Sequence, residues 1–251
     1  MRTLTMLMAL MLGLLTVPGG KNSSLAKENG YVINLDRAEK LEKMTYSSLF
    51  SKAGIIVLED TDESLLGKVD KLEVCDNNLY VLEKGRGLFL FNKQGKFIKM
   101  IGRQGKGPGE YIDPDDISID RENKKIYVLD SQTQNVLKYS GNGTFESSFK
   151  LENKGTRSTF IQPFKNALYT NLYTFDKSGK RFLLSKVDVT NGKRISFQFE
   201  ASQYNKGWNE LFSTDQHTFI SGPTGNPKFM QIFMDTIFEI TPKGIKPYIT
   251  L

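Results

Sequence analysis

The densest group of acidic side chains in this chain comprises Asp113, Asp115, Asp116 and Asp120. Hard cations such as Ca²⁺ take several oxygen ligands, which closely spaced carboxylates supply. The spacing is not that of an EF-hand, which needs glycine at the sixth position and glutamate at the twelfth. Asp113, Asp115 and Asp116 are candidate cation ligands, and Asp115 and Asp116 are candidate ligand-binding residues at the mouth of a channel. Aspartates that cap turns by accepting backbone hydrogen bonds are the alternative, and no other cofactor is expected.

Nucleophilic catalysis has little support, because the chain holds one histidine, His217, and one cysteine, Cys75. A Ser-His or Cys-His pair needs the base beside its nucleophile, and no Gly-x-Ser-x-Gly turn occurs. Both residues are interpreted as structural, and no catalytic residue is predicted. Two carboxylates paired in space for glycoside hydrolysis stay open, since any two segments of the chain could supply them.

Glycines at Gly102, Gly105, Gly107 and Gly109 are as dense as in a phosphate-binding loop. A Walker motif needs Gly-Lys followed by serine or threonine, whereas glycine follows Lys106 here. No helix is expected after the loop to offer its N-terminal amides to a phosphate. The loop is interpreted as a tight crossover between two structural units.

Aromatic residues and a Gly/Pro-rich run mark the last third of the chain. Tyr204, Trp208 and Phe212 precede the run Ser221–Pro227, which reads SGPTGNP. Aromatic faces suit sugar rings and partner side chains, so Tyr204 and Trp208 are candidate ligand-binding residues. Ordinary packing of these rings is the alternative.

The N-terminus resembles an export signal. Arg2 precedes an unbroken apolar run, Met6–Leu15, and small residues follow near Gly19. Ten apolar residues are too few to span a membrane, so residues 1–19 are predicted to be a removed signal and residues 20–251 the mature domain. The segment also resembles a lipoprotein signal, but Gly20 stands where a lipidated cysteine would be. With a net charge of +6 and no basic stripe, nucleic acid is not an expected partner.

The elements that must position these residues repeat along the chain. Leu79–Glu83 (LYVLE) recurs as Ile126–Asp130 (IYVLD), and Gly95, Gly143, Gly192 and Gly244 follow one another at intervals of 48 to 52 residues. Each glycine lies between two strand-like runs, as in a hairpin turn that needs positive φ. Four short strands per repeat predict a β-propeller, with repeats at about 69–111, 112–151, 158–200 and 210–251. A β-sandwich is the alternative.

The segments 101–111 (IGRQGKGPGEY) and 126–130 resemble NHL-type and TolB-like propellers, and most closely an exported six-bladed family abundant in Bacteroidetes. The resemblance implies an all-β fold of four-stranded antiparallel blades and a location in the periplasm, the cell envelope or outside the cell. It transfers no catalytic residues. The chain has room for about four full blades of an expected six, so we expect a truncated, incomplete ring.

These observations favour a non-enzymatic binding or scaffold module that presents loops to a protein, peptide or glycan, with no transmembrane span in the mature chain. A hydrolase or lactonase-like enzyme using the aspartates and a metal is one alternative. A structural subunit of an envelope complex is another, because fold alone does not decide function.

Overall fold

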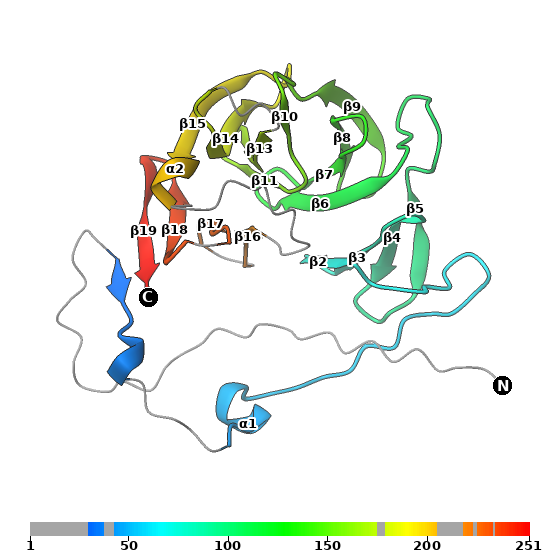
Figure 1. The fold of residues 1–251 in the computed structure, drawn as a ribbon. Coiled ribbons are helices and arrows are strands. Elements are labelled where there is room, and N and C mark those ends of the chain that lie inside the picture. The colour runs from blue at the N-terminus through cyan, green and yellow to red at the C-terminus, as the bar shows by residue number, and fades with distance from the viewer. Residues whose placement is uncertain (1–29, 38–42, 175–178, 205–217, 223–224, 233) are drawn as a thin grey trace.

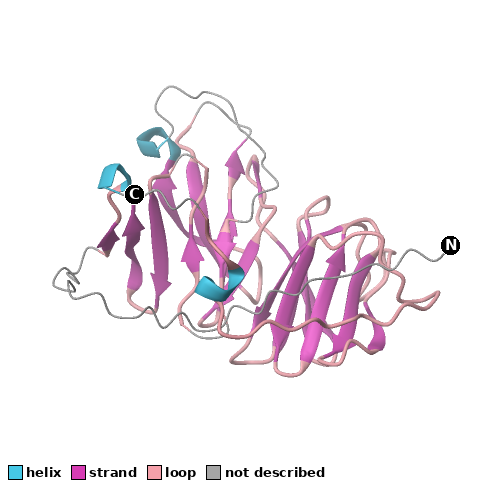
Figure 2. Ribbon diagram, turned by 90° about the horizontal axis from the view of Figure 1, so that it is seen from below, coloured by secondary structure: helices cyan, strands magenta, loops and turns pink. Residues whose placement is uncertain are grey.

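The computed structural model describes residues 30–37, 43–174, 179–204, 218–222, 225–232 and 234–251. The predicted signal, Trp208, Phe212 and His217 lie outside these residues. Within them, four antiparallel sheets form a four-bladed β-propeller (Figure 1), which confirms the predicted fold class. Figure 2 shows that the few helices are single turns beside the sheets. No described helix has the length and apolar character needed to cross a membrane.

Each blade is a four-stranded sheet whose strands follow one another in the chain. Blade 1 contains β2 (Lys71–Cys75), β3 (Asn78–Glu83), β4 (Gly87–Asn92) and β5 (Phe97–Ile101). Blade 2 contains β6 (Pro114–Asp120), β7 (Lys125–Asp130), β8 (Asn135–Ser140) and β9 (Phe145–Lys150). Blade 3 contains β11 (Ile161–Phe164), β12 (Ala167–Asn171), β14 (Phe182–Asp188) and β15 (Arg194–Glu200).

Blade 4 differs by taking a fifth strand from the start of the chain. It contains β16 (Phe219–Ile220), β17 (Lys228–Phe229), β18 (Thr236–Thr241) and β19 (Gly244–Thr250). Strand β1 (Tyr31–Val32) pairs in parallel with β19. The remaining elements are η1 (Leu35–Arg37), α1 (Tyr46–Leu49), α2 (Ala201–Tyr204) and a small pair of strands, β10 (Thr156–Arg157) with β13 (Tyr173–Thr174).

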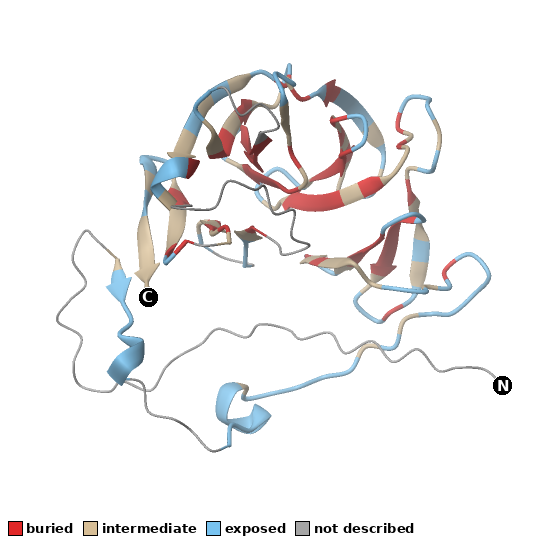
Figure 3. Cartoon of the chain, viewed as in Figure 1, coloured by how far each residue is buried: buried red, intermediate tan, exposed pale blue. Residues whose placement is uncertain are grey.

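The middle strands read as continuous apolar runs because both of their faces are buried. In β3, Tyr80 and Leu82 pack toward blade 2, whereas Leu79 and Val81 pack on the other face of blade 1. Alternate residues of a strand point to opposite faces, so a strand between two packed layers needs no polar positions. Comparable apolar clusters lie between blades 2 and 3 and between blades 3 and 4, and Figure 3 shows this burial along the strands.

The N-terminal segment covers the outer face of blade 1. Ile56 and Leu58 pack against its core, and the amide of Glu59 donates to the carbonyl of Gly95 at 2.7 Å. In the same way, Glu152 after blade 2 donates to the carbonyl of Gly192 in blade 3 at 3.0 Å. Residues 56–59 therefore contact the turn of blade 1 in the same way as the segment after blade 2 contacts the turn of blade 3.

The glycine-rich segment 102–113 joins the outer strand of blade 1 to the inner strand of blade 2. The Tyr111 hydroxyl donates to the carbonyl of Ile101 at 2.9 Å and accepts from the amide of Leu88 at 3.2 Å. The Tyr139 hydroxyl donates to the carbonyl of Gly109 at 3.0 Å. Gly102, with φ of +68°, lies so close to both rings that a side chain would clash. The segment is a packed crossover between blades.

Candidate functional site

Asp116 lies in β6, the innermost strand of blade 2, and is fully buried. Its Oδ1 is 2.7 Å from Lys71 Nζ in blade 1, and its Oδ2 accepts from the amide of Ile161 in blade 3 at 2.8 Å. The carboxylate therefore connects the innermost strands β2, β6 and β11, and protein groups contact both of its oxygens.

The other two candidate aspartates are also held by protein groups. Asp115 Oδ2 accepts hydrogen bonds from the amide and the hydroxyl of Ser131, and Asp113 Oδ1 accepts from the amide of Gly85 at 3.1 Å. Among the residues that the structure describes, no three His, Cys, Asp or Glu side chains gather where they could hold a metal ion. Cation and ligand binding by Asp113, Asp115 and Asp116 stays a prediction.

A second buried charge lies beside Asp116 along the same inner strands. Glu73 is 3.0 Å from the guanidinium of Arg121 and 4.0 Å from Lys71 Nζ. Burial raises the pKa of the Glu73 carboxyl above its usual range, because desolvation outweighs the attraction of Lys71 and Arg121. Charged groups of alternating sign thus run along the inner strands of blades 1 and 2.

The structure places Tyr204 in α2, away from the aspartates. Its ring packs against Phe199 and Phe238 at centroid distances of 5.7 and 6.5 Å, so it belongs to the aromatic cluster between blades 3 and 4. Cys75 is a free, buried cysteine at the end of β2. Burial raises the pKa of its thiol, which disfavours the reactive thiolate.

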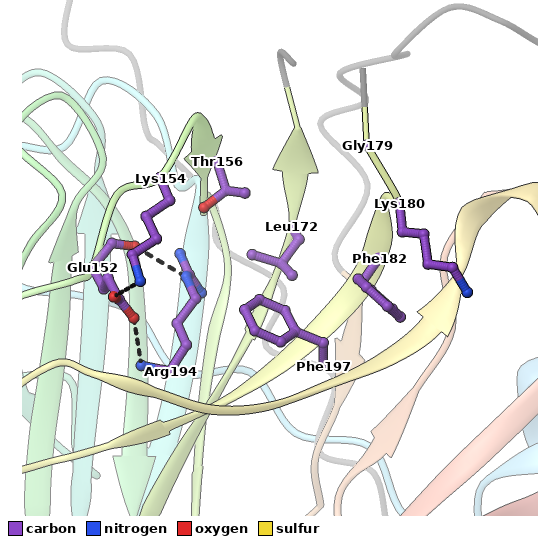
Figure 4. A pocket seen from close by; sticks show the side chains of 9 residues that line it. All are labelled: Glu152, Lys154, Thr156, Leu172, Gly179, Lys180, Phe182, Arg194 and Phe197. Atoms are coloured by element: carbon purple, nitrogen blue, oxygen red, sulfur yellow. Dashed lines mark hydrogen bonds and ion pairs between the residues drawn. The ribbon is translucent and has the colours of Figure 1, made fainter. Parts of the chain in front are cut away.

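A cavity that the sequence did not indicate lies between blade 3 and the segment that precedes it. We call it the Arg194 pocket. It measures about 320 Å³ and is lined by Glu152, Lys154, Thr156, Leu172, Gly179, Lys180, Phe182, Arg194 and Phe197 (Figure 4). The linker after blade 2 provides the first three residues, and strands β14 and β15 provide the two phenylalanines and the arginine. The Phe182 and Phe197 rings lie 5.5 Å apart and form an apolar wall.

Arg194 contacts a row of hydroxyl groups that crosses the face of blade 3. Its Nη1 donates to Thr170 Oγ1 at 3.0 Å and to Ser185 Oγ at 2.5 Å, and its Nε donates to the carbonyl of Glu152 at 3.0 Å. Ser158 Oγ continues the row by donating to Thr170 Oγ1 at 3.0 Å. Arg194, Thr170 and Ser185 share one face because β12, β14 and β15 are adjacent strands in register.

The guanidinium of Arg194 is a half-buried charge. Its hydrogen-bond acceptors among the described residues are neutral, and the Glu152 carboxylate attracts it without a direct hydrogen bond. Desolvation lowers its pKa to about 10, so it keeps its charge at neutral pH. The Glu152 carboxylate binds the Arg194 backbone amide at 3.2 Å and Lys154 Nζ at 2.7 Å. Thr156 adds a buried hydroxyl, which has no hydrogen-bond partner among the described residues. Both features would be stabilised by an anionic group that also accepts a hydrogen bond in the pocket.

The model of the domain of unknown function DUF4934 matches residues 30–251. The chain belongs to the DUF4934 family. Among curated proteins, none matches it in sequence.

The DUF4934 chain is also similar to solved structures. One is a putative exported protein from Bacteroides fragilis, with a TM-score of 0.60 and 22% identity over 77% of this chain and 53% of that protein. A member of the DUF4221 family from Bacteroides vulgatus gives a TM-score of 0.49 and 10% identity over 70% of this chain and 56% of that one. The DUF4934 chain spans about half the length of each. The first similarity shows a shared fold.

Sequence reasoning missed the Arg194 pocket because its parts are far apart in the chain. Arg194 follows Lys193 at the start of a strand, where a basic residue is usually solvated. Its partners Ser158, Thr170 and Ser185 come from three separate segments. One local signal was present, since Thr170 and Ser185 are polar residues that directly follow apolar runs in their strands.

Proposed function

We propose that the protein is a non-enzymatic binding module outside the cytoplasm, and that the Arg194 pocket is its binding site. The ligand is a peptide or small molecule that offers a carboxylate beside an apolar group. The observation that carries this proposal is the half-buried Arg194 charge, whose hydrogen-bond acceptors among the described residues are neutral. We also propose that the protein is related to six-bladed NHL- and TolB-like propellers and that it is located in the periplasm or the cell envelope.

The chemistry of the pocket supports binding over catalysis. Among the described residues that line it, Glu152 is the one carboxylate, and that carboxylate is paired with Lys154. General acid–base hydrolysis of a glycoside uses two carboxylates. Arg194, in contrast, matches a carboxylate through a planar fork of N–H donors, and Phe182 and Phe197 offer an apolar surface beside it. Exported location is supported by the Met6–Leu15 segment.

The test uses a matched pair of probes on the full chain. N-acetyl-L-phenylalanine carries a carboxylate beside an aromatic ring, and its amide differs only by lacking the charge. Isothermal titration is expected to show binding of the acid with little binding of the amide. The substitution R194Q should weaken binding of the acid at least about tenfold, since a charge-assisted bidentate contact contributes about 1.5–3 kcal/mol.

Two further variants separate binding from folding. F197A removes a half-exposed ring without touching the hydroxyl row, and it should weaken binding several-fold. K193Q removes an exposed positive charge one residue away and should leave binding unchanged. Equal affinity for the acid and the amide, no binding of the acid, or an unchanged affinity in R194Q would overturn the proposal.

A further inference from the structure

The turn glycines of blades 1 to 3 touch the segment that precedes their blade. All have positive φ, +84° at Gly95, +79° at Gly143 and +76° at Gly192. A methyl group on Gly95 would meet the carbonyl of Val57, and one on Gly192 would meet the carbonyl of Lys150. One on Gly143 would lie 2.6 Å from the Ile101 side chain. The turns at Gly143 and Gly192 thus close junctions between consecutive blades, and the turn at Gly95 closes the junction between blade 1 and the N-terminal segment.

The junction between blades 3 and 4 departs from this rule. Gly244 occupies the equivalent turn in blade 4, but no atom of the described residues lies within 4 Å of the position its Cβ would take. A cavity of about 530 Å³ lies there instead, which we call the Gly244 pocket. Blade 3 contributes Tyr169, Lys186, Ser196, Gln198 and Phe199, and the β18–β19 turn contributes residues 241–245.

Polar groups from three strands point into the Gly244 pocket. Tyr169, Lys186 and Ser196 are directly opposed on β12, β14 and β15, so their side chains share the face of blade 3 that looks toward blade 4. Gln198 lies two residues further on the same face, and its Nε2 donates to Ser196 Oγ at 2.6 Å. The Gln198 Oε1 atom is buried without a hydrogen-bond partner among the described residues. A buried amide oxygen left unpaired is costly, and a hydroxyl of a bound ligand would satisfy it.

The charges of the Gly244 pocket have one sign. Lys186 and Lys243 line it, and no aspartate or glutamate does so among the described residues. Neither lysine forms an ion pair with a carboxylate of the described chain, whereas Lys228 and Lys246 of blade 4 both pair with Glu239. The pocket therefore favours an anion, and Tyr169, Phe199 and Ile245 add apolar surface to its wall.

We propose that the Gly244 pocket is a second binding site, which takes a hexuronic acid. Its carboxylate lies between Lys186 and Lys243, its hydroxyls bind Gln198 and Ser196, and its C–H face packs on the ring of Tyr169. A hexuronate offers all three features on one ring: a charge, neighbouring hydroxyl donors and an apolar face. This site is independent of the Arg194 pocket, because the two lie on opposite faces of β15 and share no residue.

The test compares glucuronate with glucose, which carries a neutral hydroxymethyl group in place of the carboxylate, by isothermal titration of the full chain. Glucuronate is expected to bind and glucose to bind at least about tenfold more weakly. The substitutions K186M and K243M together should lower glucuronate affinity about tenfold or more, and Q198L should lower it several-fold by removing the hydroxyl acceptor. K193Q is the matched control, since it removes an exposed lysine outside the pocket. Circular dichroism of each variant verifies that the blades are formed.

The R194Q variant separates this proposal from the proposed function, because it should weaken binding of N-acetyl-L-phenylalanine at least about tenfold and leave glucuronate affinity unchanged. Methyl β-D-glucuronide adds the arm that identifies the source. If the methyl glycoside binds as tightly as glucuronate, the natural ligand is a uronate residue within a polysaccharide. If it does not bind, the natural ligand is the free acid. Both outcomes support a uronate site. Equal affinity for glucose and glucuronate, unchanged affinity in the double lysine variant, or loss of glucuronate binding in R194Q would overturn the proposal.

Discussion

The ion pair between Asp116 and Lys71 predicts that removing one central carboxylate destabilises three blades together. In the variant D116N, the amide oxygen can still accept from the Ile161 amide, but Lys71 loses its charged partner. Removing one partner of a buried ion pair costs about 3–5 kcal/mol. Lys71 remains 17% exposed and has Glu73 4.0 Å away, so we expect a loss near the lower end, about 3 kcal/mol. In D116A the Ile161 amide also loses its acceptor, which adds about 1–2 kcal/mol.

Equilibrium unfolding in urea measures these losses. With an m-value of about 1–3 kcal/mol per molar urea, D116N should lower the midpoint by one molar or more. The control is E122Q, which removes the ion pair between Lys165 and Glu122. Its length of 2.8 Å is nearly that of the Lys71–Asp116 pair, but its side chains are 51% and 64% exposed. Screening by water limits such a pair to less than about 1 kcal/mol. If D116N costs no more than E122Q, the carboxylate does not join the blades and the reasoning fails.

Three further predictions concern pH, a turn and a crossover. Burial raises the pKa of the Glu73 carboxyl above its ordinary value of 4.5, so protonation of Glu73 favours the folded state. The stability of the wild type relative to E73Q should therefore be highest below pH 4.5 and fall as the pH rises through the raised pKa. If urea unfolding shows that this relative stability increases with pH, the prediction is contradicted. The substitution G192A should lower the free energy of unfolding by at least about 1 kcal/mol more than G85A. Both glycines have similar φ, +76° and +81°, but a methyl group at Gly192 would clash with the carbonyl of Lys150, whereas one at Gly85 meets open space. Equal melting temperatures of the two variants would refute the clash. Y111F should lower thermal stability more than Y139F, since the Tyr111 hydroxyl joins two backbone groups and that of Tyr139 one; the reverse order would disprove this account of the crossover.

The turn glycines show which parts of the fold were predictable from the sequence. Gly95, Gly143 and Gly192 were expected in hairpin turns with positive φ, and the structure confirms this for all three and for Gly244. The recurring strands Leu79–Glu83 and Ile126–Asp130, one in each of blades 1 and 2, were predictable for the same reason. Both their apolar run and their flanking turn residues are local in sequence, and local signals decide short antiparallel hairpins.

Features that depend on distant segments were not predictable. Strand β1 has two residues and pairs in parallel with β19, whose partner positions lie more than 200 residues away. Asp116 illustrates the same limit within a motif, because the sequence shows that it belongs to an acidic cluster but does not show that Lys71 and Ile161 contact its carboxylate. A sequence shows that a carboxylate is present, but only the packed blades show which groups surround it.

The open turn at Gly244 has a consequence for how the protein unfolds. Blades in a propeller are repeats that stabilise their neighbours, and the turns at Gly95, Gly143 and Gly192 each close one junction, whereas the junction before blade 4 keeps a cavity. Proteins open in cooperative units, the least protected first. The backbone amides of β18 and β19 should therefore exchange with deuterium faster than those of β3 and β7. A ligand that fills the Gly244 pocket should slow that exchange and so join blade 4 to the cooperative unit of the other three.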